Sequence, residues 1–123
     1  IDTRNMTERE RLPTRRPAET FDLRWAVEAN EKPDYSVTVG YYLDGRPGEV
    51  FAAGPKDGSD MQAIINDACV ILSIALQHGA APAALAHSMG RTPVSKTEDR
   101  PSSVIGAVVD KLVSAANPRE SQA

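Results

Sequence analysis

A loop that combines two glycines, a lysine and a predicted helix start is the part of this sequence best suited to hold an anion. Residues 54–59 read Gly-Pro-Lys-Asp-Gly-Ser, and helical periodicity begins directly after them. Backbone amides at a helix N-terminus, aided by a nearby cation, bind phosphate and carboxylate groups. We therefore take Lys56, Gly58 and Ser59, with Arg46 as a further cation, as candidate ligand-binding residues. In the nucleotide-binding P-loop the lysine follows the second glycine, so a plain loop with a helix cap is the alternative interpretation.

Side chains that carry most enzyme and metal chemistry are few in this chain. Cys69 is the single cysteine, which excludes an intramolecular disulfide and a cysteine-rich zinc site. It falls within a predicted helix, where a buried structural thiol is the expected role. His78 lies in the last turn of that helix, where a histidine interacts favourably with exposed carbonyls. Because no spacing assembles a nucleophile with a base, we predict no catalytic residue, no metal site and no cofactor.

Alternating apolar residues predict strands in the first half of the chain. Residues 20–29 and 35–43 alternate with a period of two, which is typical of half-buried strands. Asp44 and Gly45 form a strong hairpin signal, and residues 49–53 are the predicted third strand. The residues expected to share one face of the first strand are Phe21, Leu23, Trp25 and Val27.

Helical periodicity dominates after residue 59. Ser59 is predicted to cap a helix over residues 60–78, with Gln62 at the capping-box position. Further helices are predicted over residues 82–89 and from residue 102 or 103 to 116, joined by a polar loop. The main apolar stripe of the first helix is expected to comprise Met61, Ile64, Ile65, Ala68, Leu72, Ala75 and Leu76. Other apolar residues, Ala63, Val70 and Ile74, fall on the opposite side, so this helix is central to the fold or lies at an oligomer interface.

The order of the elements predicts an α+β fold, in which a three-stranded antiparallel meander is followed by three helices packed on one face. We expect a flexible basic N-terminal arm at residues 1–19, a single domain over residues 20–116 and a frayed tail at residues 117–123. Met6 begins a segment that looks like a natural start, so residues 1–5 are interpreted as an addition. Two exposed sheet edges and the two-faced helix predict a homo-oligomer, a dimer formed through a sheet edge or the 60–78 helix.

Composition excludes several classes of protein. The net charge of −3 argues against a general nucleic-acid binder. No run approaches the roughly 18 apolar residues of a membrane span, and no secretory signal is apparent. A single cysteine is consistent with a reducing compartment. We therefore expect a cytoplasmic protein.

Two motifs in the chain resemble a known family. Residues 39–51 read Val-Gly-Tyr-Tyr-Leu-Asp-Gly-Arg-Pro-Gly-Glu-Val-Phe, and residues 72–79 read Leu-Ser-Ile-Ala-Leu-Gln-His-Gly. Together they resemble the TSCPD domain, the segment that follows the catalytic barrel of vitamin B12-dependent (class II) ribonucleotide reductases. The similarity extends over residues 21–116. It implies a non-catalytic accessory or assembly domain, with a ribonucleotide reductase or another enzyme of nucleotide metabolism as its partner.

The sequence also departs from those reductases. It contains no catalytic barrel, no cysteine-rich tail and no Thr-Ser-Cys-Pro-Asp motif. Ribonucleotide reduction by such enzymes needs three cysteines, and these residues supply one, so they are not expected to catalyse it alone. The alternative prediction is a regulatory protein that binds a nucleotide, a phosphate or another small molecule at the 54–59 loop.

Overall fold

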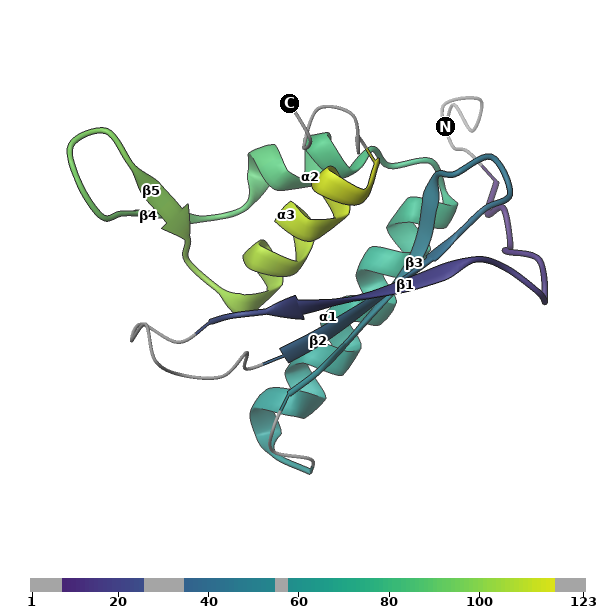
Figure 1. The fold of residues 1–123 in the computed structure, drawn as a ribbon, viewed down its shortest axis with the longest axis horizontal. Helices are drawn as coiled ribbons and strands as arrows, with labels where there is room; N and C mark the ends of the chain where they lie inside the picture. The colour runs from purple at the N-terminus through teal and green to yellow at the C-terminus, as the bar shows by residue number, and fades with distance from the viewer. Residues whose placement is uncertain (1–7, 26–34, 55–57, 117–123) are drawn as a thin grey trace, which may run out of the picture.

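The computed structural model of the chain describes residues 8–25, 35–54 and 58–116. A three-stranded sheet comes first and is followed by helices and a small hairpin (Figure 1). The elements are β1 (Ala18–Leu23), β2 (Tyr35–Tyr41), β3 (Pro47–Ala53), α1 (Asp60–Gln77), α2 (Pro82–Ser88), β4 (Arg91–Pro93), β5 (Asp99–Pro101) and α3 (Val104–Ala116). This order confirms the predicted α+β class. None of the helices that the structure describes combines the length and apolarity that a membrane crossing requires.

The sheet is an antiparallel meander in the order β1-β2-β3. Val37 in β2 lies opposite Phe21 in β1 and Ala52 in β3, so these three side chains share one face. Both α1 and α3 pack on that face, and α2 packs against α3 (Figure 1). The predicted meander with helices on one face is confirmed.

The core lies between this face of the sheet and helices α1 and α3. Val39 and Val50 from the sheet, and Val108 and Leu112 from α3, have no exposed surface, and Ile65 of α1 retains 1%. Burial of apolar surface is the main force that stabilises such a layer. Helix α3 is therefore as central to stability as the first strands.

The buried face of α1 differs from the predicted stripe. Its buried apolar residues are Ile65, Cys69, Leu72 and Leu76. Met61 and Ile64 belong to the predicted main stripe, but they are 56% and 62% exposed. The prediction is wrong because Gln62 and Gln77 are also buried and face β3, which turns the inward face of the helix away from Met61 and Ile64. An apolar pattern alone cannot anticipate buried glutamines.

Polar side chains of α1 occupy the outer edge of β3. Gln62 accepts a hydrogen bond from the Gly54 amide (2.7 Å) and donates one to the Ala52 carbonyl (2.9 Å). The Ser73 hydroxyl accepts from the Val50 amide (2.9 Å). An edge strand normally offers such groups to another chain. Because α1 already forms hydrogen bonds with these groups, a second copy could pair with the β3 edge only by displacing α1. The predicted dimer through a sheet edge would therefore need the other edge of the sheet.

A polar joint ties the end of α1 to part of the predicted N-terminal arm. Gln77 donates to the Gly48 carbonyl (2.9 Å) and accepts from Arg9 Nε (2.6 Å). The Glu10 amide donates to the Gln77 carbonyl (2.7 Å), and the Tyr42 hydroxyl donates to the Glu10 carbonyl. Residues 8–17 form no helix or strand, yet these bonds attach the segment to both motifs of the sequence.

The first strand is shorter than predicted. β1 ends at Leu23, which pairs with Tyr35 at the start of β2. Trp25, predicted to continue the strand, is half-buried beyond its end, and Val27 lies outside the described residues. The alternation of residue types continues past Leu23, where the strand ends, so the sequence pattern overestimates the length of the strand.

A second hairpin replaces the predicted polar loop at residues 91–101. β4 and β5 pair with Arg91 opposite Pro101, and the Arg91 guanidinium bonds the Asp99 carboxylate (2.8 Å). The prediction of a polar loop is wrong in that these residues contain two short strands. Strands of three residues, each ending in a proline, are too short and polar to produce a period-two apolar signal.

Candidate functional site

The structure separates the residues predicted to bind an anion. Gly58 adopts a positive φ of 77° and Ser59 caps α1, accepting from the Gln62 amide (3.1 Å). Lys56 lies outside the described residues. Arg46 borders a hollow together with Leu76, at the opposite end of α1. Since α1 has 18 residues and so spans about 27 Å, Arg46 cannot share a ligand with Gly58 and Ser59.

Arg46 is also engaged by its neighbours. Its guanidinium bonds the carboxylates of Asp44 (2.8 Å) and Glu10 (3.0 Å) and lies 4.6 Å from the centre of the Tyr42 ring. Hydrogen bonds from the amide and guanidinium of Arg46 lower the pKa of Asp44. These contacts give Arg46 a structural role in the hairpin turn.

The remaining reactive side chains are placed as structural groups. Cys69 is 2% exposed, and burial raises the pKa of its thiol, which disfavours the reactive thiolate. His78 is the C-terminal cap of α1. Within the described residues, no group of three or more histidine, cysteine or acidic side chains is placed to hold a metal ion.

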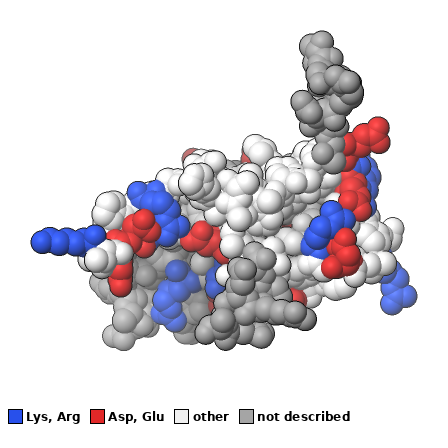
Figure 2. Space-filling model, turned by 90° about the horizontal axis from the view of Figure 1, so that it is seen from above, with Lys and Arg blue, Asp and Glu red and all other residues white. Residues whose placement is uncertain are grey.

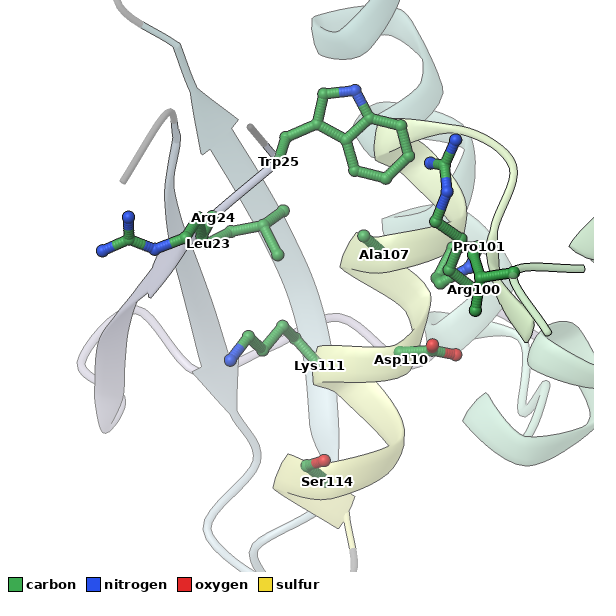
Figure 3. A pocket seen from close by; sticks show the side chains of 10 residues that line it. Leu23, Arg24, Trp25, Arg100, Pro101, Ala107, Asp110, Lys111 and Ser114 are labelled. Carbon is green, nitrogen blue, oxygen red and sulfur yellow. The ribbon is translucent and has the colours of Figure 1, made fainter. Parts of the chain in front are cut away.

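A hollow of about 550 Å³ lies where the end of β1, helix α3 and the β4–β5 hairpin meet (Figure 3). Leu23 and Ala107 are the buried apolar residues of its lining. Figure 3 shows the Trp25 ring facing the Arg100 side chain at one end, and Lys111 extending from α3 towards the strand that carries Leu23. The hollow therefore combines an apolar base with an aromatic ring and basic groups.

The basic side chains at the hollow are only partly neutralised. The Arg100 guanidinium carbon lies 5.5 Å from the centre of the Trp25 ring, a cation–π distance. Within the part of the chain that the structure describes, neither Arg100 nor Lys111 is paired with a carboxylate. Arg24 adds a third cation to the lining. The local charge is thus positive in a protein whose net charge is −3.

Among the described residues, the one carboxylate that borders this hollow, Asp110, is paired with an arginine that does not line it. Asp110 accepts a hydrogen bond from Arg91 (3.1 Å), which also binds Asp99. These two pairs leave the positive charge of Arg100 and Lys111 uncompensated by Asp110. Such a surface favours an anionic ligand that also carries a flat apolar group.

Sequence reasoning missed this hollow. Trp25, Arg100 and Lys111 are far apart in the chain, and the β4–β5 hairpin that presents Arg100 gave no strand signal. The one usable signal was Trp25, the single tryptophan. A lone aromatic residue cannot by itself identify the basic groups that meet it.

The surface also carries an apolar region on α1. Figure 2 shows one face of the molecule, where charged side chains gather in mixed groups towards two ends with an uncharged band between them. Elsewhere, the solvent-facing side of α1 presents large apolar side chains that are 37% to 68% exposed: Met61, Ile64, Val70, Ile71 and Ile74. Exposed apolar patches of this kind mark interaction surfaces.

Comparisons with known proteins place this fold in context. A model of the TSCPD domain family matches residues 7–115. A vitamin B12-dependent ribonucleotide reductase of Rhodopirellula baltica is 32% identical over 107 residues, which cover 85% of this chain and 10% of that protein. A vitamin B12-dependent ribonucleotide reductase of Bradyrhizobium diazoefficiens is 36% identical over 74 residues, covering 60% of this chain and 6% of that protein.

The predicted resemblance is therefore confirmed over most of the chain. The chain spans a tenth or less of the length of these curated relatives. No solved structure matches it significantly. The matched region includes the N-terminal segment bonded to Gln77 as well as the sheet and the three helices.

Proposed function

Because this chain belongs to the TSCPD domain family, we propose that it is a non-catalytic assembly domain of nucleotide metabolism. It works in the cytoplasm and pairs with a second copy of itself through α1. The observation that carries this proposal is the apolar outer side of α1. The buried thiol of Cys69 supports a role without catalysis. The names of the relatives support the link to nucleotide metabolism.

The size of the apolar side of α1 suits a dimer. Five large side chains, each about half exposed, present an apolar patch on the order of 500 Å², the upper end of the range for monomers. Two such patches would bury about 1,000 Å², the lower limit for a specific interface. A second copy of the chain therefore supplies enough surface to cover this side of the helix.

The spacing of residues on α1 is complementary to itself. Ile64, Ala68, Ile71 and Ala75 follow one another at intervals of four, three and four residues, so they form one stripe along the helix. The isoleucines are exposed and the alanines half-buried. With a two-fold axis between residues 69 and 70, antiparallel helices would place Ile64 opposite Ala75, and Ala68 opposite Ile71. Each large side chain would then meet a small one, which permits close packing, as an isologous dimer requires.

Ile71→Asp is expected to convert the dimer to a monomer of 13.2 kDa. Ile71 is 68% exposed, so the change should leave the monomer folded while placing two unpaired carboxylates in the interface. Multi-angle light scattering across a concentration series gives the mass. Val94→Asp is the matched control, since Val94 is 55% exposed on the β4–β5 hairpin, and it should remain dimeric. A wild-type chain that is monomeric at every concentration would contradict the proposal.

The link to a reductase needs a separate experiment. We propose that the chain binds a vitamin B12-dependent ribonucleotide reductase or another enzyme of nucleotide metabolism, on the basis of its relatives. Titration calorimetry with a purified vitamin B12-dependent reductase from the same cells would test whether the chain binds the reductase. A phosphate-binding role for the 54–59 loop stays a prediction.

A further inference from the structure

We propose that the hollow formed by Trp25, Arg100 and Lys111 binds an aromatic anion of the nucleoside phosphate class. This inference goes beyond the assembly role and does not depend on pairing through α1. It rests on three features that coincide in one place: a buried apolar base, an aromatic face and uncompensated positive charge.

The apolar part of the hollow fits a flat ring system. Leu23 is 7% exposed and Ala107 is 7% exposed, so both offer a base that is already shielded from water. The half-buried Trp25 ring and Pro101 border this base. A purine or pyrimidine can contact such surfaces whatever its hydrogen-bonding edge, because stacking uses only the ring face.

The basic part of the hollow fits phosphate oxygens. Arg100 lies beside Trp25 in a cation–π contact, and its N–H groups have no carboxylate partner among the described residues. Lys111 reaches the same hollow from α3 (Figure 3). The two groups border the hollow from different sides, so a ligand that spans it would contact both, with phosphate oxygens bound by the guanidinium or the ammonium.

Volume and charge together distinguish this hollow from the one beside Arg46. Its volume of about 550 Å³ lies within the usual range for small-molecule pockets. A hollow of about 510 Å³ beside Arg46 is similar in size, but Arg46 is already bound by Asp44 and Glu10. The hollow at Arg100 is the better match for an anionic ligand.

The single tryptophan makes the proposal directly measurable. Trp25 is the only one in the chain, so fluorescence excited selectively at tryptophan reports on the hollow alone. Titration with ATP is expected to change this fluorescence in a saturable manner. Adenosine and inorganic tripolyphosphate, which each lack one half of the ligand, should bind at least about tenfold more weakly. The affinity for ATP should also fall as salt is raised.

Variants locate the binding site. Arg100→Ala and Lys111→Ala are each expected to weaken ATP binding about tenfold. Lys96→Ala removes the same charge from the hairpin loop, where the side chain is exposed and does not line the hollow, and should leave the affinity unchanged. Far-ultraviolet circular dichroism confirms that the variants are folded, and calorimetry gives the affinity independently of Trp25.

Distinct outcomes would overturn this inference. The inference would be contradicted if the fluorescence change did not saturate with millimolar ATP. It would also be contradicted if Arg100→Ala bound ATP as tightly as the wild type does. Loss of binding only in Lys56→Ala would instead assign the ligand to the 54–59 loop. Ile71→Asp should bind ATP with unchanged affinity, because Ile71 does not line the hollow. The proposal of ATP binding and the proposal of pairing through α1 can therefore fail independently.

Discussion

Leu112→Ala is expected to lower the free energy of unfolding by about 3 kcal/mol, because a fully buried leucine leaves both lost contacts and a cavity when it is truncated. Leu112 has no exposed surface and belongs to the core cluster shared by the sheet, α1 and α3. Urea denaturation followed by circular dichroism measures the change at constant protein concentration.

Leu43→Ala is the matched control for this prediction. Leu43 is 78% exposed, so the same truncation should change the free energy of unfolding by less than about 0.5 kcal/mol. Equal effects at Leu112 and Leu43 would show that α3 does not close the core as described.

Gln77→Ala is expected to lower the free energy of unfolding by about 2 kcal/mol, because it leaves buried polar groups without their partners. The side chain is buried and bonds both the Gly48 carbonyl and Arg9. The same urea experiment measures this loss. Protection of the Glu10 amide from hydrogen exchange should also fall, since that amide bonds the Gln77 backbone at the joint.

Asn66→Ala provides the comparison on the same helix. Asn66 is exposed and accepts one hydrogen bond from Gln62, so its removal should cost under about 1 kcal/mol. If Gln77→Ala were no more destabilising than Asn66→Ala, the joint between α1 and the N-terminal segment would not contribute to stability.

The same joint explains why the two motifs occur together. Tyr42 and Gly48 belong to the hairpin motif and Gln77 to the helix-end motif. Tyr42 and Gln77 bond the N-terminal segment, and Gly48 bonds Gln77. A Cβ atom at Gly48 would come within 2.6 Å of the Tyr42 ring and 2.8 Å of Leu12. The motifs thus describe the packing of one corner of the domain.

The elements of the fold could be predicted wherever one physical signal dominates. The alternation in β2 and the Ser59 cap of α1 are local signals, and both agree with the structure. The inward face of α1 could not be predicted, because Gln62 and Gln77 at its margin are buried. Their burial depends on hydrogen bonds to β3, which form only once the helix packs on the sheet. The β4–β5 hairpin is stabilised by an ion pair, Arg91 with Asp99, instead of an apolar pattern.

The candidate site was less predictable than the fold. The 54–59 loop was found by its composition, but Arg46 proved to lie at the other end of α1. The hollow at Trp25 and Arg100 depends on a contact between the end of β1 and the second hairpin. Distance along the sequence conceals such a site until the topology is known.

The most direct test of the assembly role is a size swap at the two-fold axis, measured by sedimentation equilibrium. Ala68→Ile alone should weaken the dimer about tenfold or more, because it would meet Ile71 of the second copy and overfill the interface. Adding Ile71→Ala restores one large and one small side chain at each contact, so Ala68→Ile with Ile71→Ala should dimerise nearly as well as the wild type. Thermal unfolding confirms that each variant is folded. A double variant that dimerises no better than the single one, or a wild type that never exceeds 13.2 kDa, would contradict pairing through α1.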